Sequence, residues 1–212
     1  MQSALAHWEA MNGLRPRRPL VCIIDLLGLA VTSLLLVGHE PKLVVAVLPV
    51  AILIQYVTSC AYHWLPQNDL RQKVDQGMIV LLVAATYVPF WGTQLPASEL
   101  LWRLPIVALL TIISLVLRCS FSSWWRLSAG MYPVLGGFGC IVSFNELQVW
   151  LPPLALAMFW VGVGCYFLQF IIWAKHRPNP VPNLFGYREV QHLILLCGTT
   201  LHTIVVLNFL AV

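Results

Sequence analysis

Residues 59–75 read SCAYHWLPQNDLRQKVD, and this stretch joins two long apolar segments of the chain. It leaves the first segment through Ser59 and His63, which are four residues apart, crosses a short polar hinge and enters the next segment at Asp75. These polar side chains stand at the edges of segments that otherwise exclude them. A second stretch, residues 185–192 (FGYREVQH), enters the last apolar segment in a similar way. The two stretches are therefore predicted to converge on one site.

The composition of the 212 residues excludes a soluble domain. Hydrophobic residues make up 59% of the chain and charged residues only 9%, and the mean hydropathy is +0.82. Soluble domains carry about 25% charged residues, so lipid is the predicted solvent for most of this chain. The Lys and Arg residues are scattered singly or in pairs rather than gathered on one basic face, which excludes nucleic acid as a partner.

The apolar segments predict an all-α fold, a polytopic membrane protein built as a seven-transmembrane-helix bundle. A helical span needs ~20 predominantly apolar residues. Residues 1–18 are predicted to be a cytoplasmic lead-in, with room for a short interfacial helix, and residues 19–212 a single seven-helix membrane domain. The spans are predicted at about residues 19–37, 43–64, 74–91, 101–117, 127–144, 149–173 and 187–212, with a tight turn at residues 145–148.

The basic residues predict how the bundle is oriented. With seven spans, the N-terminus and every second loop lie on one side of the membrane, and that side carries ten of the twelve Lys and Arg residues. Because basic residues are retained on the cytoplasmic side, the N-terminus is predicted to be cytoplasmic and the C-terminus outside. The ten residues are Arg15, Arg17, Arg18, Arg71, Lys73, Arg118, Arg126, Lys175, Arg177 and Arg188, and the remaining two are Lys42 and Arg103.

This topology places several polar side chains at a similar depth in the inner leaflet. His63 ends a span that runs inward and Asp75 begins the next one, while Arg188 and His192 begin the last span from the same side. His202 follows His192 by ten residues, which puts it ~15 Å deeper in the membrane at 1.5 Å per residue. His202 is therefore predicted to belong to a different layer.

Two histidines and one aspartate from three helices suit a metal site. Imidazole is a common zinc ligand, and a catalytic zinc ion holds three protein ligands and leaves one position for water. Zinc lowers the pKa of that water to about 7, which gives a nucleophile at neutral pH. A carboxylate beside the water can then act as a general base.

The alternative is that each polar group is satisfied locally. Ser59 could bond the carbonyl one turn earlier, His63 could face cytoplasmic water, and Arg188 could reach the lipid headgroups. For Asp25, which lies inside the first span, a hydrogen bond to a neighbouring helix or to the basic residues is favoured over a catalytic role. The common depth of the other residues favours a shared site.

The chain carries, in order, the motifs S-x-x-x-H (59–63), D-x-G (75–77), A-x-T-Y-x-P-F (84–90), R-P-N-P (177–180) and F-G-Y-x-E-x-x-H (185–192). Their order and spacing resemble those of the hemolysin III family, the bacterial branch of the progestin and adipoQ receptor (PAQR) superfamily, which is related more distantly to alkaline ceramidases. The resemblance covers the chain from about residue 18 to the end. It implies a seven-helix membrane fold with a cytoplasmic N-terminus, in the bacterial inner membrane, and a zinc ion near the inner leaflet.

The resemblance assigns roles to individual residues. His63 and His192 match zinc ligands, Asp75 matches the carboxylate that bonds the zinc-bound water, and Ser59 matches the serine that lies alongside. His202 also matches a family position, one that lies deeper in the bundle and is not a ligand.

Arg188 departs from the family pattern, because it stands where the family has its other last-helix histidine. Arginine stays protonated and cannot bind zinc. Three outcomes are open: Asp75 becomes the third direct ligand, zinc binds through two histidines and waters, or the metal is absent and Arg188 pairs with Asp75.

Two classes of function follow from this pattern. The first is a zinc-dependent hydrolase of membrane lipid amides or esters, with Asp75 and Ser59 as catalytic residues and a substrate class taken from the resemblance alone. The second is a non-catalytic receptor-like or membrane-homeostasis protein whose polar residues brace the bundle. The presence of Arg188 in place of a histidine favours this second hypothesis. A cytolysin ranks third, because no span has a polar face that would line a wide channel. Both main hypotheses make membrane lipids the partners and leave the oligomeric state open.

Overall fold

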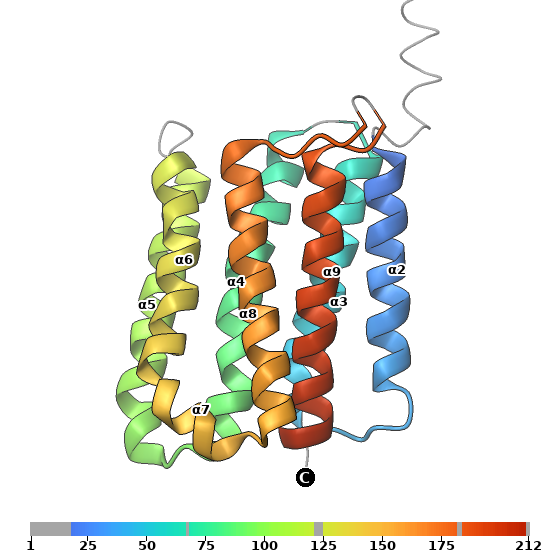
Figure 1. The fold of residues 1–212 in the computed structure, drawn as a ribbon. Coiled ribbons are helices and arrows are strands. Elements are labelled where there is room, and N and C mark those ends of the chain that lie inside the picture. Colours follow the sequence, from blue (N-terminus) through green and yellow to red (C-terminus); the bar gives the residue numbers. More distant parts are fainter. Residues whose placement is uncertain (1–17, 67, 121–124, 182–183, 211–212) are drawn as a thin grey trace, which may run out of the picture.

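The computed structural model describes residues 18–66, 68–120, 125–181 and 184–210 as a bundle of helices that run up and down (Figure 1). A short helix, α7 (Phe144–Trp150), joins α6 to α8, and a π-helical turn (Val206–Leu210) extends α9. The predicted all-α bundle is confirmed. Its long helices within these residues are α2 (Pro19–Leu36), α3 (Leu43–Trp64), α4 (Asp69–Gln94), α5 (Ala97–Ser120), α6 (Trp125–Val142), α8 (Pro153–Lys175) and α9 (Tyr187–Val205).

Most of these helices can cross a membrane. Among the described residues, six are long and apolar enough, namely α2, α3, α4, α5, α8 and α9 with its π-helical turn. The seventh, α6, contributes a shorter apolar helix, Gly130–Val142. Because a helix bonds its backbone polar groups within one segment, it is one of the few structures that lipid tolerates. The chain is therefore a multi-pass membrane protein.

The start of α4 differs from the prediction, because the helix begins at Asp69 rather than at about residue 74. The side chain of Asn68 accepts a hydrogen bond from the Leu70 backbone N–H at 2.8 Å and caps the helix. One turn further, Lys73 pairs with Asp69 at 2.8 Å. Polar bonds of this kind begin a helix where hydropathy gives no signal, so Asp75 lies in the second turn of α4 rather than the first.

The connection between α6 and α8 also differs from the prediction. Residues 145–148 were expected to form a tight turn, but they lie inside the helix α7. The next span was expected from about residue 149, but α8 begins at Pro153, where a proline at the first position has no N–H to lose. A contact from a distant helix, Arg103 of α5 to Glu146 of α7, holds α7 in place.

The helices pack so that both polar stretches reach the same end of the bundle. α3 lies against α2 and α4, α9 lies against α2 and α8, and α5 and α6 form a pair beside α4 (Figure 1). The end of α3, the start of α4 and the start of α9 all lie at the upper end in Figure 1. The predicted convergence of the two stretches therefore follows from the order of the helices.

Tyr56 of α3 sets the spacing of three helices beside this site. Its ring lies against Gly28 of α2, where an added Cβ would be only 2.3 Å from the ring Cζ. Its hydroxyl lies 2.7 Å from Oγ1 of Thr199 on α9. A glycine at position 28 thus lets α2 approach α3 closely enough for side chains of α2 to reach α9.

The expected interfacial helix within residues 1–18, with Arg15 and Arg17, lies outside the described residues. The other expected cytoplasmic basic residues belong to helix ends or connections at the upper end in Figure 1. The direction of the bundle across the membrane stays a prediction.

Candidate functional site between the first, second and last long helices

His63 and His192 are neighbours in the structure, as the convergence of the two stretches predicts. His63 lies at the end of α3 and His192 in the second turn of α9, and both side chains are buried. Their ring centroids are 5.1 Å apart and the rings are nearly perpendicular, at 83°. Two imidazoles from helices far apart in sequence thus form the centre of the candidate site.

Asp25 fixes the orientation of His192. Its side chain is fully buried in α2, with 0% of its surface exposed, and its Oδ1 accepts a hydrogen bond from Nδ1 of His192 at 2.8 Å. The predicted hydrogen bond from Asp25 to a neighbouring helix is therefore confirmed. Because Nδ1 holds the proton of this bond, neutral His192 keeps the lone pair on Nε2. That nitrogen is the one available to a ligand or a proton.

Asp75 is held by a residue that the sequence did not single out. Nε2 of Gln55 donates to Oδ1 of Asp75 at 3.3 Å, and both side chains are buried. Gln55 precedes Ser59 and His63 at intervals of four residues, so it lies on the same face of α3. That spacing was the signal that could have identified Gln55 from the sequence.

Ser59 has no local partner, contrary to the alternative of a bond to its own helix. Its Oγ is buried, and it has no hydrogen-bond partner among the described residues. The carbonyl of Gln55, which it was expected to use, accepts instead from Oγ1 of Thr58 at 3.0 Å. The hydroxyl of Ser59 therefore lies buried one turn before His63 and is not bonded to its own helix.

Part of this polar site faces a cavity of about 610 Å³ that runs between α4, α6, α8 and α9. His63, Asp75, Arg188 and His192 all line it. A cavity of this size is typical of sites for a single small ligand. The site can therefore hold an organic molecule next to the paired imidazoles.

His202 lines the same cavity but serves another purpose. Its Nε2 donates to the carbonyl of Phe159 at 3.1 Å, and its ring is stacked on that of Phe159 at a centroid distance of 5.1 Å. The imidazole also fills the space beside Gly162 of α8, where an added Cβ would lie 2.5 Å from Nε2. In the structure, His202 thus joins α9 to α8.

Arg188 lies beside the histidines and lines the cavity, but it does not bond Asp75. Its guanidinium carbon lies 5.5 Å from the centre of the Tyr187 ring. None of the ion pairs found among the described residues joins Arg188 to Asp75.

The arrangement does not match a three-ligand zinc site. In the part of the chain that the structure describes, no group of three or more His, Cys, Asp or Glu side chains is placed to hold a metal ion. His63 and His192 supply two donors, Asp75 is bonded to Gln55, and Arg188 offers no lone pair. Arg188, at the position where the resemblance expects a ligand, thus supplies no third donor.

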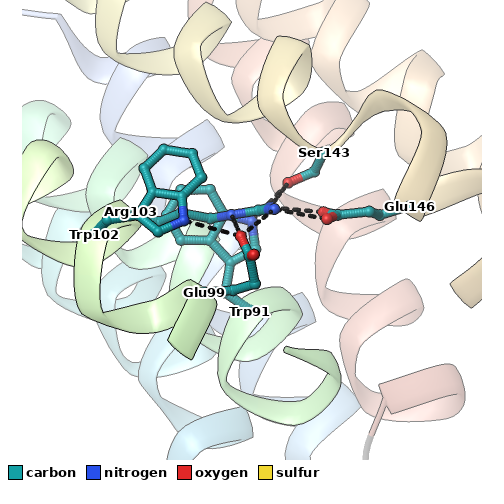
Figure 2. Close-up of polar contacts among 6 residues, drawn as sticks. All are labelled: Trp91, Glu99, Trp102, Arg103, Ser143 and Glu146. Carbon is teal, nitrogen blue, oxygen red and sulfur yellow. Dashed lines mark hydrogen bonds and ion pairs between the residues drawn. The ribbon is translucent and has the colours of Figure 1, made fainter. Parts of the chain in front are cut away.

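A second polar cluster surrounds Arg103 (Figure 2), near the start of α5 and beside α7, at the lower end of the bundle in Figure 1. Arg103 of α5 is buried, with 4% of its surface exposed. Both terminal nitrogens donate to the carboxylate of Glu146 on α7 at 2.6 Å, and Nε and Nη2 donate to Glu99 at 3.2 and 3.0 Å. The guanidinium also faces the rings of Trp102 and Trp91, at 5.1 and 5.7 Å from their centres. All of these contacts indicate a structural role.

The Arg103 cluster could be predicted from the sequence only in part. Glu99 precedes Arg103 by four residues on the same helix, which is the spacing of a helical ion pair. Glu146 is 43 residues away in sequence, and no pattern joins the two. Trp91 completes the cluster through a 2.7 Å hydrogen bond to Oγ of Ser143, to which Arg103 also donates at 3.4 Å.

Comparison with known families agrees with the motifs. Residues 7–203 match the family described as haemolysin-III related. The match contains every residue of the candidate site, from Asp25 to His202, and it begins within the expected lead-in segment 1–18. Because the match spans most of the chain, this multi-pass membrane protein belongs to the haemolysin-III related family.

Proposed function

We propose that this protein is a membrane-embedded hydrolase that cleaves an ester or amide bond of a membrane lipid at the inner leaflet. The observation that carries the proposal is the buried Asp25–His192 pair, whose histidine lines, together with His63, a cavity large enough for a lipid chain. A histidine oriented by a buried carboxylate is a recurring general base.

The chemistry needs only a water molecule and the residues of the chain. Nε2 of His192 takes a proton from the water, and the oxygen adds to the carbonyl carbon of the substrate. Asp25 stabilises the resulting imidazolium through Nδ1. When the carbonyl re-forms, the bond to the leaving alcohol or amine breaks, and His192 returns the proton to it. Asp75 orients the water, and the hydroxyl of Ser59 donates a hydrogen bond to the developing oxyanion.

Hydrolysis of fluorescent acyl esters and acyl amides by purified protein in detergent tests this proposal. His192→Ala is expected to lower kcat by about 10²–10⁴-fold, which is the usual contribution of a general base. His39→Ala serves as the control, because His39 lies in the α2–α3 connection and is not among the residues that line the cavity. Turnover by wild type no faster than the detergent blank, or equal rates for wild type and His192→Ala, contradicts the proposal.

The zinc ion that the resemblance implies is a separate prediction, and no step above depends on it. Zinc, when bound, would lower the pKa of its bound water and so supply a stronger nucleophile at neutral pH. Arg188→His adds a third imidazole, so this variant is expected to bind zinc more tightly than wild type, as measured by calorimetry and metal analysis. Arg188→Gln, which adds no imidazole, is the control. Equal zinc affinity for the His and Gln variants would show that position 188 is not a ligand position.

A non-catalytic receptor-like or membrane-homeostasis protein is the second candidate. It is favoured by the polar contacts that tie α2 to α9, namely Asp25 to His192 at 2.8 Å and Arg18 to Glu189 at 3.4 Å. In this second candidate function, the polar residues stabilise the packing of the helices and take no part in catalysis. Loss of thermal stability in His192→Ala, together with no turnover by wild type on either substrate class, would support it.

A further inference from the structure

Arg188 places a guanidinium at the polar end of the cavity. Within the described residues, no hydrogen bond or ion pair involves its side chain. The adjacent acid, Glu189, is already engaged, because its Oε1 bonds Arg18 at 3.4 Å and its Oε2 accepts from the backbone N–H of Gly186 at 2.8 Å. Arg188 therefore has its donors available to a molecule in the cavity.

The cavity as a whole carries more positive than negative charge. Lys73, Arg118 and Arg188 line it, against the carboxylates of Asp69 and Asp75. Lys73 and Asp69 neutralise each other at 2.8 Å. The Nε of Arg118 is buried without a hydrogen-bond partner among the described residues. After this pairing, two arginines and the carboxylate of Asp75 remain among the described lining residues, while the carboxylate of Asp25 is bonded to His192 and does not line the cavity, so the cavity favours an anion.

The remainder of the lining is apolar and aromatic. Away from the polar end, the walls are formed by side chains such as Val83, Phe90, Phe159, Val163, Phe167 and Phe170. A ligand that matches both parts has an acidic head and a hydrocarbon tail. The volume of about 610 Å³ lies in the range of sites for one small ligand, which suits a single chain.

We propose that Arg188 binds the acidic headgroup, a carboxylate or a phosphate, of a single-chain amphiphile whose tail lies between α4, α6 and α8. A planar guanidinium binds either group with two parallel hydrogen bonds. Arg188, which stands where the resemblance expects a histidine ligand, thus gives the site a preference for anionic lipids. This inference rests on the proposed function in that it names the headgroup of the lipid, but it concerns binding and not cleavage.

Equilibrium binding of radiolabelled dodecanoate, dodecyl phosphate and dodecanol to the detergent-purified full chain tests the proposal. Wild type is expected to bind at least one acid about tenfold or more tightly than dodecanol, which has the same tail without the charge. Arg188→Gln is expected to lose that preference and to keep its affinity for dodecanol, which also reports that the variant is folded. Arg188→Lys keeps the charge but not the paired donors, so an intermediate affinity is expected.

Arg71→Gln is the matched control, because it removes a cation at the same end of the bundle from a residue that is not among those lining the cavity. It is expected to bind all three compounds like wild type. Tighter binding of dodecyl phosphate or of dodecanoate supports the proposal and identifies the acid. Equal affinity of wild type for acids and dodecanol, or acid binding by Arg188→Gln equal to wild type, overturns it. Acid preference without hydrolysis overturns only the proposed function.

Discussion

At the scale of single residues, the hydrogen bond from His192 to Asp25 has the largest consequence. It orients the imidazole that we propose as the general base, and it joins the first and last described long helices. Both side chains are buried, so neither can exchange its partner for bulk water. Removing one partner of a buried bond costs more than the bond contributes, because the other partner is left unsatisfied.

Asp25→Ala is therefore expected to lower the free energy of unfolding by about 1–3 kcal/mol. Asp25→Asn keeps an acceptor oxygen for Nδ1 of His192 and is expected to lose less. Thermal unfolding in detergent measures both. Glu40→Ala is the control, because Glu40 is an exposed acid in the connection between α2 and α3, and no measurable change is expected. Equal stability of Asp25→Ala and wild type would show that the bond to His192 does not hold the helices together.

At the scale of elements, α7 depends on its contact with α5. This seven-residue helix is too short to be stable alone. Glu146 of α7 accepts two 2.6 Å hydrogen bonds from the buried Arg103, and these fix the corner between α6 and α8. Because α6 and α8 both line the cavity, the same contact holds the cavity walls in place.

Glu146→Ala is expected to destabilise the protein by about 1–3 kcal/mol, the range for losing bonds to a charged group. Glu99 still faces Arg103 in this variant and limits the loss. A second readout is the rate of alkylation of Cys140, a free cysteine on α6 that lines the cavity. This rate is expected to rise as the corner loosens.

Glu40→Ala provides the control for Glu146→Ala. Glu40 is an exposed acid in the connection between α2 and α3, at the same end of the bundle as α7. It is expected to change neither the unfolding temperature nor the alkylation of Cys140. The same alkylation rate in Glu146→Ala and wild type would contradict the role of α7 in holding the cavity walls.

At the scale of the whole molecule, the basic residues predict the direction of the bundle. Ten of the twelve Lys and Arg residues belong to one side in the seven-span topology. A phosphatase that folds only outside the cell is expected to be active when fused after Val212 and inactive when fused after Arg177. The opposite result would reverse the orientation and place the candidate site in the outer leaflet.

Several features of this protein were determined by local sequence alone. Lipid requires every backbone polar group to be bonded within its own segment, so hydropathy predicted the all-α fold and the approximate spans. The four-residue spacings of Ser59 with His63 and of Arg188 with His192 placed each pair on one helix face. Prediction failed where polar bonds override hydropathy, at the start of α4 and at α7.

Only the tertiary structure decided which helix faces meet. The sequence contained Asp25, Gln55 and Glu146 without indicating their partners, because His192, Asp75 and Arg103 lie on other helices, far away in the chain. The close approach of α2 depends on the missing side chain at Gly28 and the Tyr56 ring that fills its place. Helix formation is local, whereas the pairing of buried polar groups depends on packing between distant segments. The membrane spans could therefore be predicted from the sequence, whereas the contacts within the site could be identified only in the tertiary structure.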